Sequence, residues 1–172
     1  MTYFFTSDYH LGHKKIIQYC KRPFKNVTLM NETIIKNHNK IVKPNDTVYF
    51  LGDFCFNNFK FYRRQLNGKF IFIMGNHDRH NDVPTIMWAA VIKHGGKIIY
   101  LTHDPVDIVE DVEINLVGHV HEHWKHNKSL NGIPVINVGV DVWKFKPVTI
   151  EEIFKDYHKL CGVQKNGFRV HS

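Results

Sequence analysis

The sequence lacks the features of disulfide-stapled, membrane-spanning and cysteine-ligated zinc proteins. Its three cysteines, Cys20, Cys55 and Cys161, are odd in number, far apart and without CxxC spacing, which excludes a disulfide framework and a thiolate zinc site. The apolar run at residues 3–5 is too short for a signal-peptide core, and no apolar run is long enough to span a membrane. We therefore expect a soluble, cytoplasmic protein with no membrane partner.

Linkers, internal repeats and low-complexity segments are also absent. No stretch rich in glycine, serine or proline divides the 172 residues. Hydrophobic residues make up 43% and aromatic residues 13% of the chain, which is enough to fill a continuous core. We expect one domain over residues 1–172.

Acidic residues are fewer than basic ones, since 16 aspartates and glutamates stand against 23 lysines and arginines, a formal net charge of +7. Five basic residues cluster near the amino terminus: Lys14, Lys15, Lys21, Arg22 and Lys25. Such a cluster favours an anionic partner, nucleic acid among them, or forms a solvated basic face. Charge alone does not decide between the two.

Short apolar runs rich in β-branched and aromatic residues outnumber helical patterns. Helical spacing over residues 30–42 follows an N-cap predicted at Thr28, and residues 59–66 and 151–160 are further helix candidates. The predicted strands cover residues 3–6, 47–51, 70–74, 89–92, 98–101, 114–117, 135–138 and 148–150. The chain is therefore expected to be of mixed α/β class.

Three early strands end abruptly in polar or glycine-rich clusters: YFFTSDYH, VYFLGDF and FIFIMGNHD. In α/β folds, ligands bind at the carboxyl ends of strands, where loops converge on a rigid sheet. The three clusters therefore predict one shared site. Glycines 52, 75 and 118 stand where the backbone has to turn sharply or let a ligand approach closely.

The candidate donors are carboxylates, imidazoles and one amide oxygen, a mixture that suits Mn²⁺, Fe²⁺ or Zn²⁺. Alternate residues of a strand point to the same face, so an Asp-x-His or His-x-His pair can contact one ion. These donors are too many for one tetrahedral ion and suit two ions, an arrangement built for phosphoryl transfer. Two divalent ions and two carboxylates leave a net charge of about +2, which favours an anionic substrate. The donors are Asp8, His10, Asp53, Asn76, His103, His119 and His121.

The ordered blocks DYH (8–10), GD (52–53), GNHD (75–78), His103 and GHVH (118–121) resemble the calcineurin-like metallophosphoesterase family. The likeness extends from about residue 4 to about residue 150. It implies a four-layer α/β/β/α sandwich of two mixed β-sheets flanked by helices, with two metals at the strand ends. Mn²⁺ is the expected ion, with Fe²⁺, Zn²⁺ and Ni²⁺ as alternatives.

The resemblance also implies roles for individual residues, with Asp53 bridging the two metals. His77 would donate a proton or hydrogen bond to the leaving oxygen, and a metal-bridging hydroxide would attack phosphorus. The first metal would be held by Asp8, His10, Asp53 and His121, and the second by Asp53, Asn76, His103 and His119.

One position departs from the family pattern, in which many members read GDxxD. Here the stretch is GDFCFN, so Phe56 stands where an acidic residue would support the catalytic histidine. Asp78 or a backbone carbonyl is the expected substitute for orienting His77. His13 and Arg79, close in sequence to the ligands, are candidate donors to a substrate phosphate or plain surface residues.

Other polar and aromatic residues near the motifs are predicted to be structural. Glu122, His123 and His126 fall outside the matched blocks and read as a polar strand or turn, while Asp141 and Trp143 follow a turn. The function predicted is hydrolysis of phosphate esters, with phosphodiesters favoured. The alternatives are a nuclease, a non-catalytic interaction module with the same fold, and a nucleic-acid-binding protein with histidine-rich structural zinc.

Overall fold

The computed structural model describes residues 1–84 and 87–160, and the predictions for Cys161 and for the carboxyl-terminal segment fall outside these ranges. The first β-sheet has the strand order β3-β2-β1-β9. Three of its strands run parallel and β9 pairs antiparallel with β1. These strands are β1 (Tyr3–Thr6), β2 (Thr47–Leu51), β3 (Lys69–Ile73) and β9 (Val148–Thr149).

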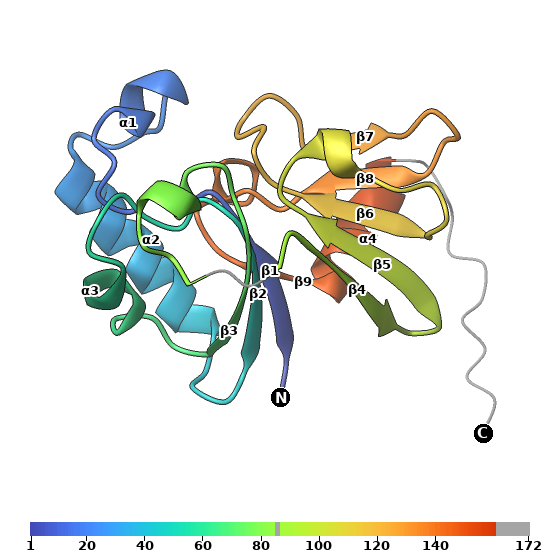
Figure 1. Cartoon of the computed structure of the whole chain (residues 1–172), viewed down its shortest axis with the longest axis horizontal. Helices are drawn as coiled ribbons and strands as arrows, with labels where there is room; N and C mark the ends of the chain where they lie inside the picture. Colours follow the sequence, from blue (N-terminus) through green and yellow to red (C-terminus); the bar gives the residue numbers. More distant parts are fainter. Residues whose placement is uncertain (85–86, 161–172) are drawn as a thin grey trace.

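The second sheet has the order β4-β5-β6-β8-β7 and is also mixed (Figure 1). Its parallel centre, β5, β6 and β8, is flanked by antiparallel pairs at both edges. The edge strand β7 has the polar sequence HNK, without the apolar run that marks the other strands. The members are β4 (Ala89–His94), β5 (Lys97–Thr102), β6 (Ile114–Val117), β7 (His126–Lys128) and β8 (Pro134–Asn137).

Helices flank the two sheets. The N-cap of α2 is Asn26, whose side chain accepts from the backbone N–H of Leu29, so the cap predicted at Thr28 was wrong by two residues. Short 3₁₀ turns, η1 (Asp78–His80), η2 (Pro105–Asp107) and η3 (Val140–Val142), lie in the loops. The helices are α1 (Ile16–Tyr19), α2 (Val27–Ile41), α3 (Phe59–Arg63) and α4 (Ile150–Leu160).

Alternation along the strands of the first sheet fills two apolar cores. Phe5 and Leu51 point between the sheets, where they meet Leu116 of β6. Phe50 points the other way, onto Ile34 of α2. Two mixed sheets with helices on their flanks are the architecture that the sequence predicts, so the predicted fold class is confirmed.

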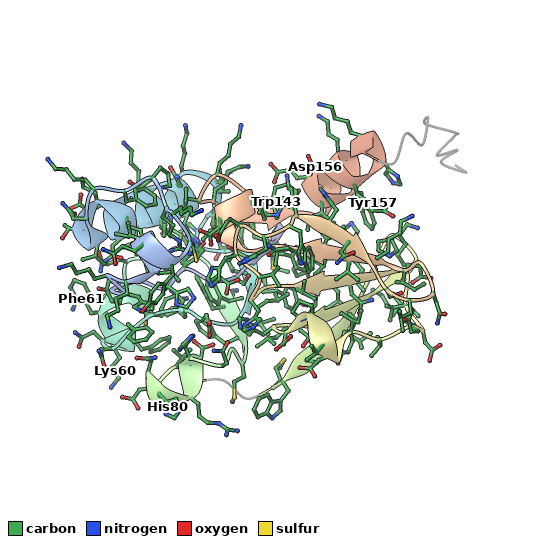
Figure 2. All side chains as sticks on the ribbon, turned by 90° about the horizontal axis from the view of Figure 1, so that it is seen from above. Lys60, Phe61, His80, Trp143, Asp156 and Tyr157 are labelled. Atoms are coloured by element: carbon green, nitrogen blue, oxygen red, sulfur yellow. The ribbon has the colours of Figure 1, made fainter. Side chains whose placement is uncertain are left out.

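The helix α4 is attached to the second sheet through Lys125, which precedes β7. The Lys125 ammonium lies 2.7 Å from the carboxylate of Asp156 and 3.5 Å from the ring centroid of Trp143. Both of these partners, Asp156 and Trp143, are labelled in Figure 2. The indole of Trp143 is buried and donates to the carbonyl of Asn137. The structural role predicted for Trp143 is therefore confirmed. No helix among the described residues is both long and apolar enough to cross a membrane.

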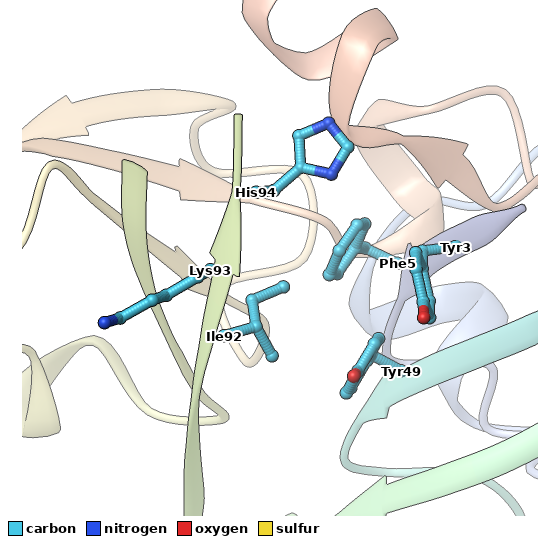
Figure 3. A pocket seen from close by; sticks show the side chains of 6 residues that line it. All are labelled: Tyr3, Phe5, Tyr49, Ile92, Lys93 and His94. Atoms are coloured by element: carbon cyan, nitrogen blue, oxygen red, sulfur yellow. The ribbon is translucent and has the colours of Figure 1, made fainter. Parts of the chain in front are cut away.

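The amino-terminal ends of β1 and β2 border a groove between the sheets of about 270 Å³. Figure 3 shows its walls, where Tyr49 stacks on Phe5 at a centroid distance of 5.4 Å and Ile92 of β4 lies opposite. Asp8 and Asp53 follow the other ends of the same two strands. The polar clusters therefore converge at the carboxyl ends of the strands, away from this groove.

Candidate metal centre

Asp8 and His10 lie in the loop that follows β1, and both are buried. Their backbone N–H groups donate to the carbonyls of Gly52 and Asp53, each at 3.0 Å, so the loops after β1 and β2 are joined. The sequence predicted that the two side chains share the face of an extended strand. The structure instead places both residues in the left-handed region, with φ of 58° and 49°.

Asp53 lies between two histidine nitrogens. Its Oδ2 is 3.4 Å from Nε2 of His10 and 3.6 Å from Nε2 of His103. Burial raises the pKa of this carboxyl to about 7, with the nearby Asp8 carboxylate adding to the effect and His103 opposing it. Cationic or metal partners on both sides of the Asp53 carboxylate would lower its pKa and hold it ionised at neutral pH.

Asn76, His103 and His119 form the second half of the cluster. The amide oxygen of Asn76 lies 3.1 Å from Nε2 of His103 and 3.1 Å from Nδ1 of His119. Nδ1 of His103 donates to the carbonyl of Leu51 at 2.7 Å, so the lone pair of Nε2 faces the cluster, where it could bind a metal ion. The turn after β6 thus directs His119 to this half.

His121 lies on the other side, with its ring centroid 5.1 Å from that of His10. Its Nδ1 is 3.1 Å from the carboxylate of Asp141, which in turn accepts two hydrogen bonds of 2.8 Å from Arg22. Burial lowers the pKa of His121, but hydrogen bonds to Asp141 and to the Cys20 thiol outweigh it and raise that pKa to about 10.

Arg22 and Asp141 are site residues that the sequence did not identify. Arg22 is only 4% exposed and also donates to the backbone carbonyls of Asp8 and Tyr9. Arg22 is therefore not part of a solvated basic face, one of the two alternatives for its cluster, whereas Lys14 and Lys15 are exposed. The two residues are 119 positions apart, so no motif spacing could have paired them.

Strained backbone is concentrated among the candidate ligands. A positive φ is uncommon for residues other than glycine, yet Asp53, His119 and His121 adopt it, in addition to Asp8 and His10. The glycines at the site are required by close packing, since a Cβ on Gly75 would overlap the carboxylate of Asp53 and one on Gly118 would lie 2.8 Å from Oδ2 of Asp8. Such strain is typical of functional sites, where the surrounding structure has to stabilise it.

The side chain of Asp78 contacts backbone N–H groups and not the His77 ring that it was predicted to orient. Its carboxylate is fully buried and accepts from the backbone N–H groups of Asp53, Phe54 and Gly75 at 2.8–2.9 Å. Within residues 1–84 and 87–160, no hydrogen bond joins it to the ring of His77. The predicted orienting role is therefore unsupported, and Asp78 instead fixes the loop ends after β2 and β3.

His77 faces the cluster with aromatic neighbours. Its ring centroid is 5.5 Å from that of His10 and 5.7 Å from that of Phe56. Its backbone N–H donates to Oδ1 of Asp53, and its carbonyl accepts from Asn81. Burial, with a contribution from His103, lowers the pKa of His77.

The remaining candidates lie at the rim or outside the cluster. His13 stacks on Phe56 at a centroid distance of 4.0 Å and lies 5.5 Å from the His10 ring. Arg79 is exposed, with its guanidinium 5.1 Å from the ring centroid of Trp88. His123 is exposed, and its ring contacts the carbonyl of Val120 at 2.9 Å within the same turn, as a turn residue would.

Two groups of side chains are close enough to hold a metal ion each: Asp8 with His10 and His121, and Asp8 with Asp53 and His103. Within each group the donor atoms lie within 4.8 Å of one another. Nε2 of His10 is buried and has no hydrogen-bond partner in the described structure, which is costly unless a ligand completes it. The oxygen and nitrogen donors therefore fit a divalent transition-metal ion.

An uncharacterized protein of Methanocaldococcus jannaschii is 38% identical to this chain in an alignment of 164 positions that covers 87% of each protein. The chain belongs to the family of this archaeal protein. A protein of unknown function from Aquifex aeolicus, 30% identical, has a TM-score of 0.69, and the likeness covers 89% of this chain and 97% of that one. Neither family member's name states an activity.

No family model matches the chain. A predicted phosphoesterase from Streptococcus pneumoniae TIGR4 is 17% identical, with a TM-score of 0.47 over 80% of this chain and 71% of that one. That likeness is too weak to support a statement about activity.

Replacing Asp141 tests the support of His121. In the metal-free protein, Asp141→Asn removes the anion that stabilises the imidazolium, so the pKa of His121 falls from about 10 toward its ordinary value near 6.5. NMR titration of the imidazole measures the change. Asp104→Asn, which removes a carboxylate beside His119, is the control and leaves the His121 titration unchanged. An unaltered His121 pKa in Asp141→Asn would contradict this account.

Proposed function

We propose that this protein is a metal-dependent phosphoesterase that hydrolyses phosphodiesters at a centre of two divalent ions. The observation that carries the proposal is the position of Asp53, with one carboxylate oxygen between Nε2 of His10 and Nε2 of His103. A shared carboxylate is what two ions roughly 3.5–4 Å apart require. The ordered motifs that resemble the metallophosphoesterases point to the same chemistry.

The two halves of the cluster supply separate sets of ligands around this carboxylate. His10, His121 and Asp8 would hold one ion, while His103, His119 and Asn76 would hold the other. When bound, the ions polarise the phosphate and lower the pKa of a water molecule that attacks phosphorus. Mn²⁺ is the ion we favour, because the donors are oxygen and imidazole nitrogen without thiolate.

His77 acts on the leaving group in this proposal. The attacking water loses one proton to solvent as its oxygen forms a bond to phosphorus, the bond from phosphorus to the leaving oxygen breaks, and the leaving oxygen takes up one proton from the protonated His77 ring, which then regains a proton from solvent. The ring centroid of His77 lies 5.5 Å from that of His10 and 6.4 Å from that of His13, close enough to the cluster for its N–H to reach that oxygen. Phe56 and His13 pack around its ring and limit its orientation.

A non-catalytic interaction module with the same fold is the main alternative. It would need neither His77 at the cluster nor a full ligand set, and the chain has both. A histidine-rich structural zinc protein would unfold when the metal is removed. The buried cores on both faces of the first sheet consist of apolar side chains, which favours a scaffold that persists without metal.

A panel of phosphate esters tests the proposal directly. We expect the Mn²⁺-loaded protein to cleave a bis-aryl phosphate faster than an aryl monophosphate. Single-stranded DNA is the third substrate and tests for nuclease activity. Chelation abolishes turnover while circular dichroism shows the strand signal retained, and added Mn²⁺ restores the activity. Cleavage of the monoester alone would overturn the diesterase assignment, and no cleavage of any ester with metal bound would favour the non-catalytic module.

Replacing His77 separates catalysis from metal binding. His77→Asn removes the imidazole that donates a proton to the leaving oxygen, so turnover of the bis-aryl phosphate falls by about 10²- to 10⁴-fold. Metal analysis finds the same metal content as in the wild type, because His77 is not a ligand in this proposal. His123→Asn, an exposed histidine in the turn after β6, is the matched control and keeps full activity. Unchanged turnover in His77→Asn would remove His77 from the mechanism.

A further inference from the structure

An exposed tryptophan lies beside the metal centre. Trp88 is 63% exposed, which leaves most of a large aromatic surface in contact with water. It directly precedes β4, and His103 directly follows β5, the antiparallel partner of β4. Because Ala89 pairs with Thr102, Trp88 and His103 emerge from the same end of this strand pair.

The segment before Trp88 is also tied to the GNHD loop. The backbone N–H of Met74 donates to the carbonyl of Met87 at 3.0 Å, and Ile73 forms a bridge with Met87. Arg79, two residues after His77, extends over Trp88 with its guanidinium 5.1 Å from the ring centroid. Trp88 is thus connected to metal-centre loops of both sheets.

A cavity of about 390 Å³ opens next to Trp88 on the second sheet. Its walls include the aromatic ring of Tyr100, the buried Thr102 and the exposed carboxylate of Asp107. The same chain segment carries Asp104, whose carboxylate lies 3.9 Å from Nε2 of His119. The cavity and the cluster therefore share one chain segment, in which Thr102 and Asp107 line the cavity while His103 and Asp104 lie at the cluster.

We infer that Trp88 and Arg79 form a subsite for the nucleobase of a nucleoside phosphodiester whose phosphate lies at the metal centre. Aromatic side chains stack on bases of any sequence, and a guanidinium pairs with phosphate oxygens. Asp107 accepts hydrogen bonds from amino and ring N–H groups of the base. This inference rests on the proposed function and adds the substrate class to it.

Binding of two probes to the Mn²⁺-loaded protein tests the subsite. Calorimetry compares a dinucleoside phosphorothioate, which resists cleavage, with dimethyl phosphate, which has no base. Trp88→Ala lowers the ratio of the two affinities by about 10- to 100-fold, because stacking on Trp88 is lost. Trp88→Phe restores most of the ratio, since a phenyl ring also stacks. An unchanged ratio in Trp88→Ala would overturn the inference.

The chain offers a matched control in another exposed pair of an arginine and an aromatic ring. The Arg64 guanidinium lies 5.2 Å from the ring centroid of Phe61, which is 48% exposed. Phe61→Ala leaves the affinity ratio unchanged, and a fall equal to that of Trp88→Ala would contradict a specific subsite.

Two further measurements distinguish the source of the base from the validity of the proposed function. A single-stranded oligonucleotide that binds much more tightly than the dinucleotide identifies nucleic acid as the source, whereas equal binding identifies a small dinucleotide. Both results support the subsite. Failure of the metal-loaded protein to cleave a bis-aryl phosphate overturns the proposed function, while loss of dinucleotide binding in Trp88→Ala remains a separate observation in favour of the subsite.

Discussion

The carboxylate of Asp78 is the constraint on which the candidate metal centre depends. It is fully buried and holds three backbone N–H groups, two in the loop after β2 and one in the loop after β3. A buried carboxylate is stable only when such partners replace water. By joining these loops it positions Asp53 in a left-handed conformation, from which its side chain lies between His10 and His103.

Support from outside the ligand set extends to the other half of the centre. Arg22 and Asp141 form a buried, bidentate ion pair. Asp141 contacts His121, and Arg22 donates to the carbonyl of Asp8. The pairing of an arginine with a carboxylate in this geometry is among the stronger polar contacts in proteins. It fixes the histidine ring while leaving the ring available to the cluster.

Much of the fold could be predicted from the sequence because its strands are short, apolar and bounded by glycine or polar residues. β1, β2 and β6 begin and end where the pattern predicts. The edge strand β7 is polar, so neither hydrophobicity nor alternation marks it as a strand, and a polar strand or turn was the most that its sequence indicated. Candidate ligands at strand ends could be predicted for the same reason, since each follows such a run.

The supporting contacts could not be predicted, because they join residues far apart in sequence. Arg22 reads as one of several surface cations until the fold brings Asp141 to it. Asp78 reads as the neighbour of His77, but its carboxylate reaches backbone groups instead. Trp88 has no motif around it, and only the pairing of β4 with β5 places it near His103.

The central claim is that Asp53 bridges two metal ions. Anomalous diffraction from crystals of the Mn²⁺-loaded protein tests this most directly. We predict two anomalous peaks of similar height, roughly 3.5–4 Å apart, on either side of the Asp53 carboxylate. One peak would lie near His10 and His121, and the other near His103 and His119. A single peak, or two peaks that both lie away from Asp53, would contradict the account.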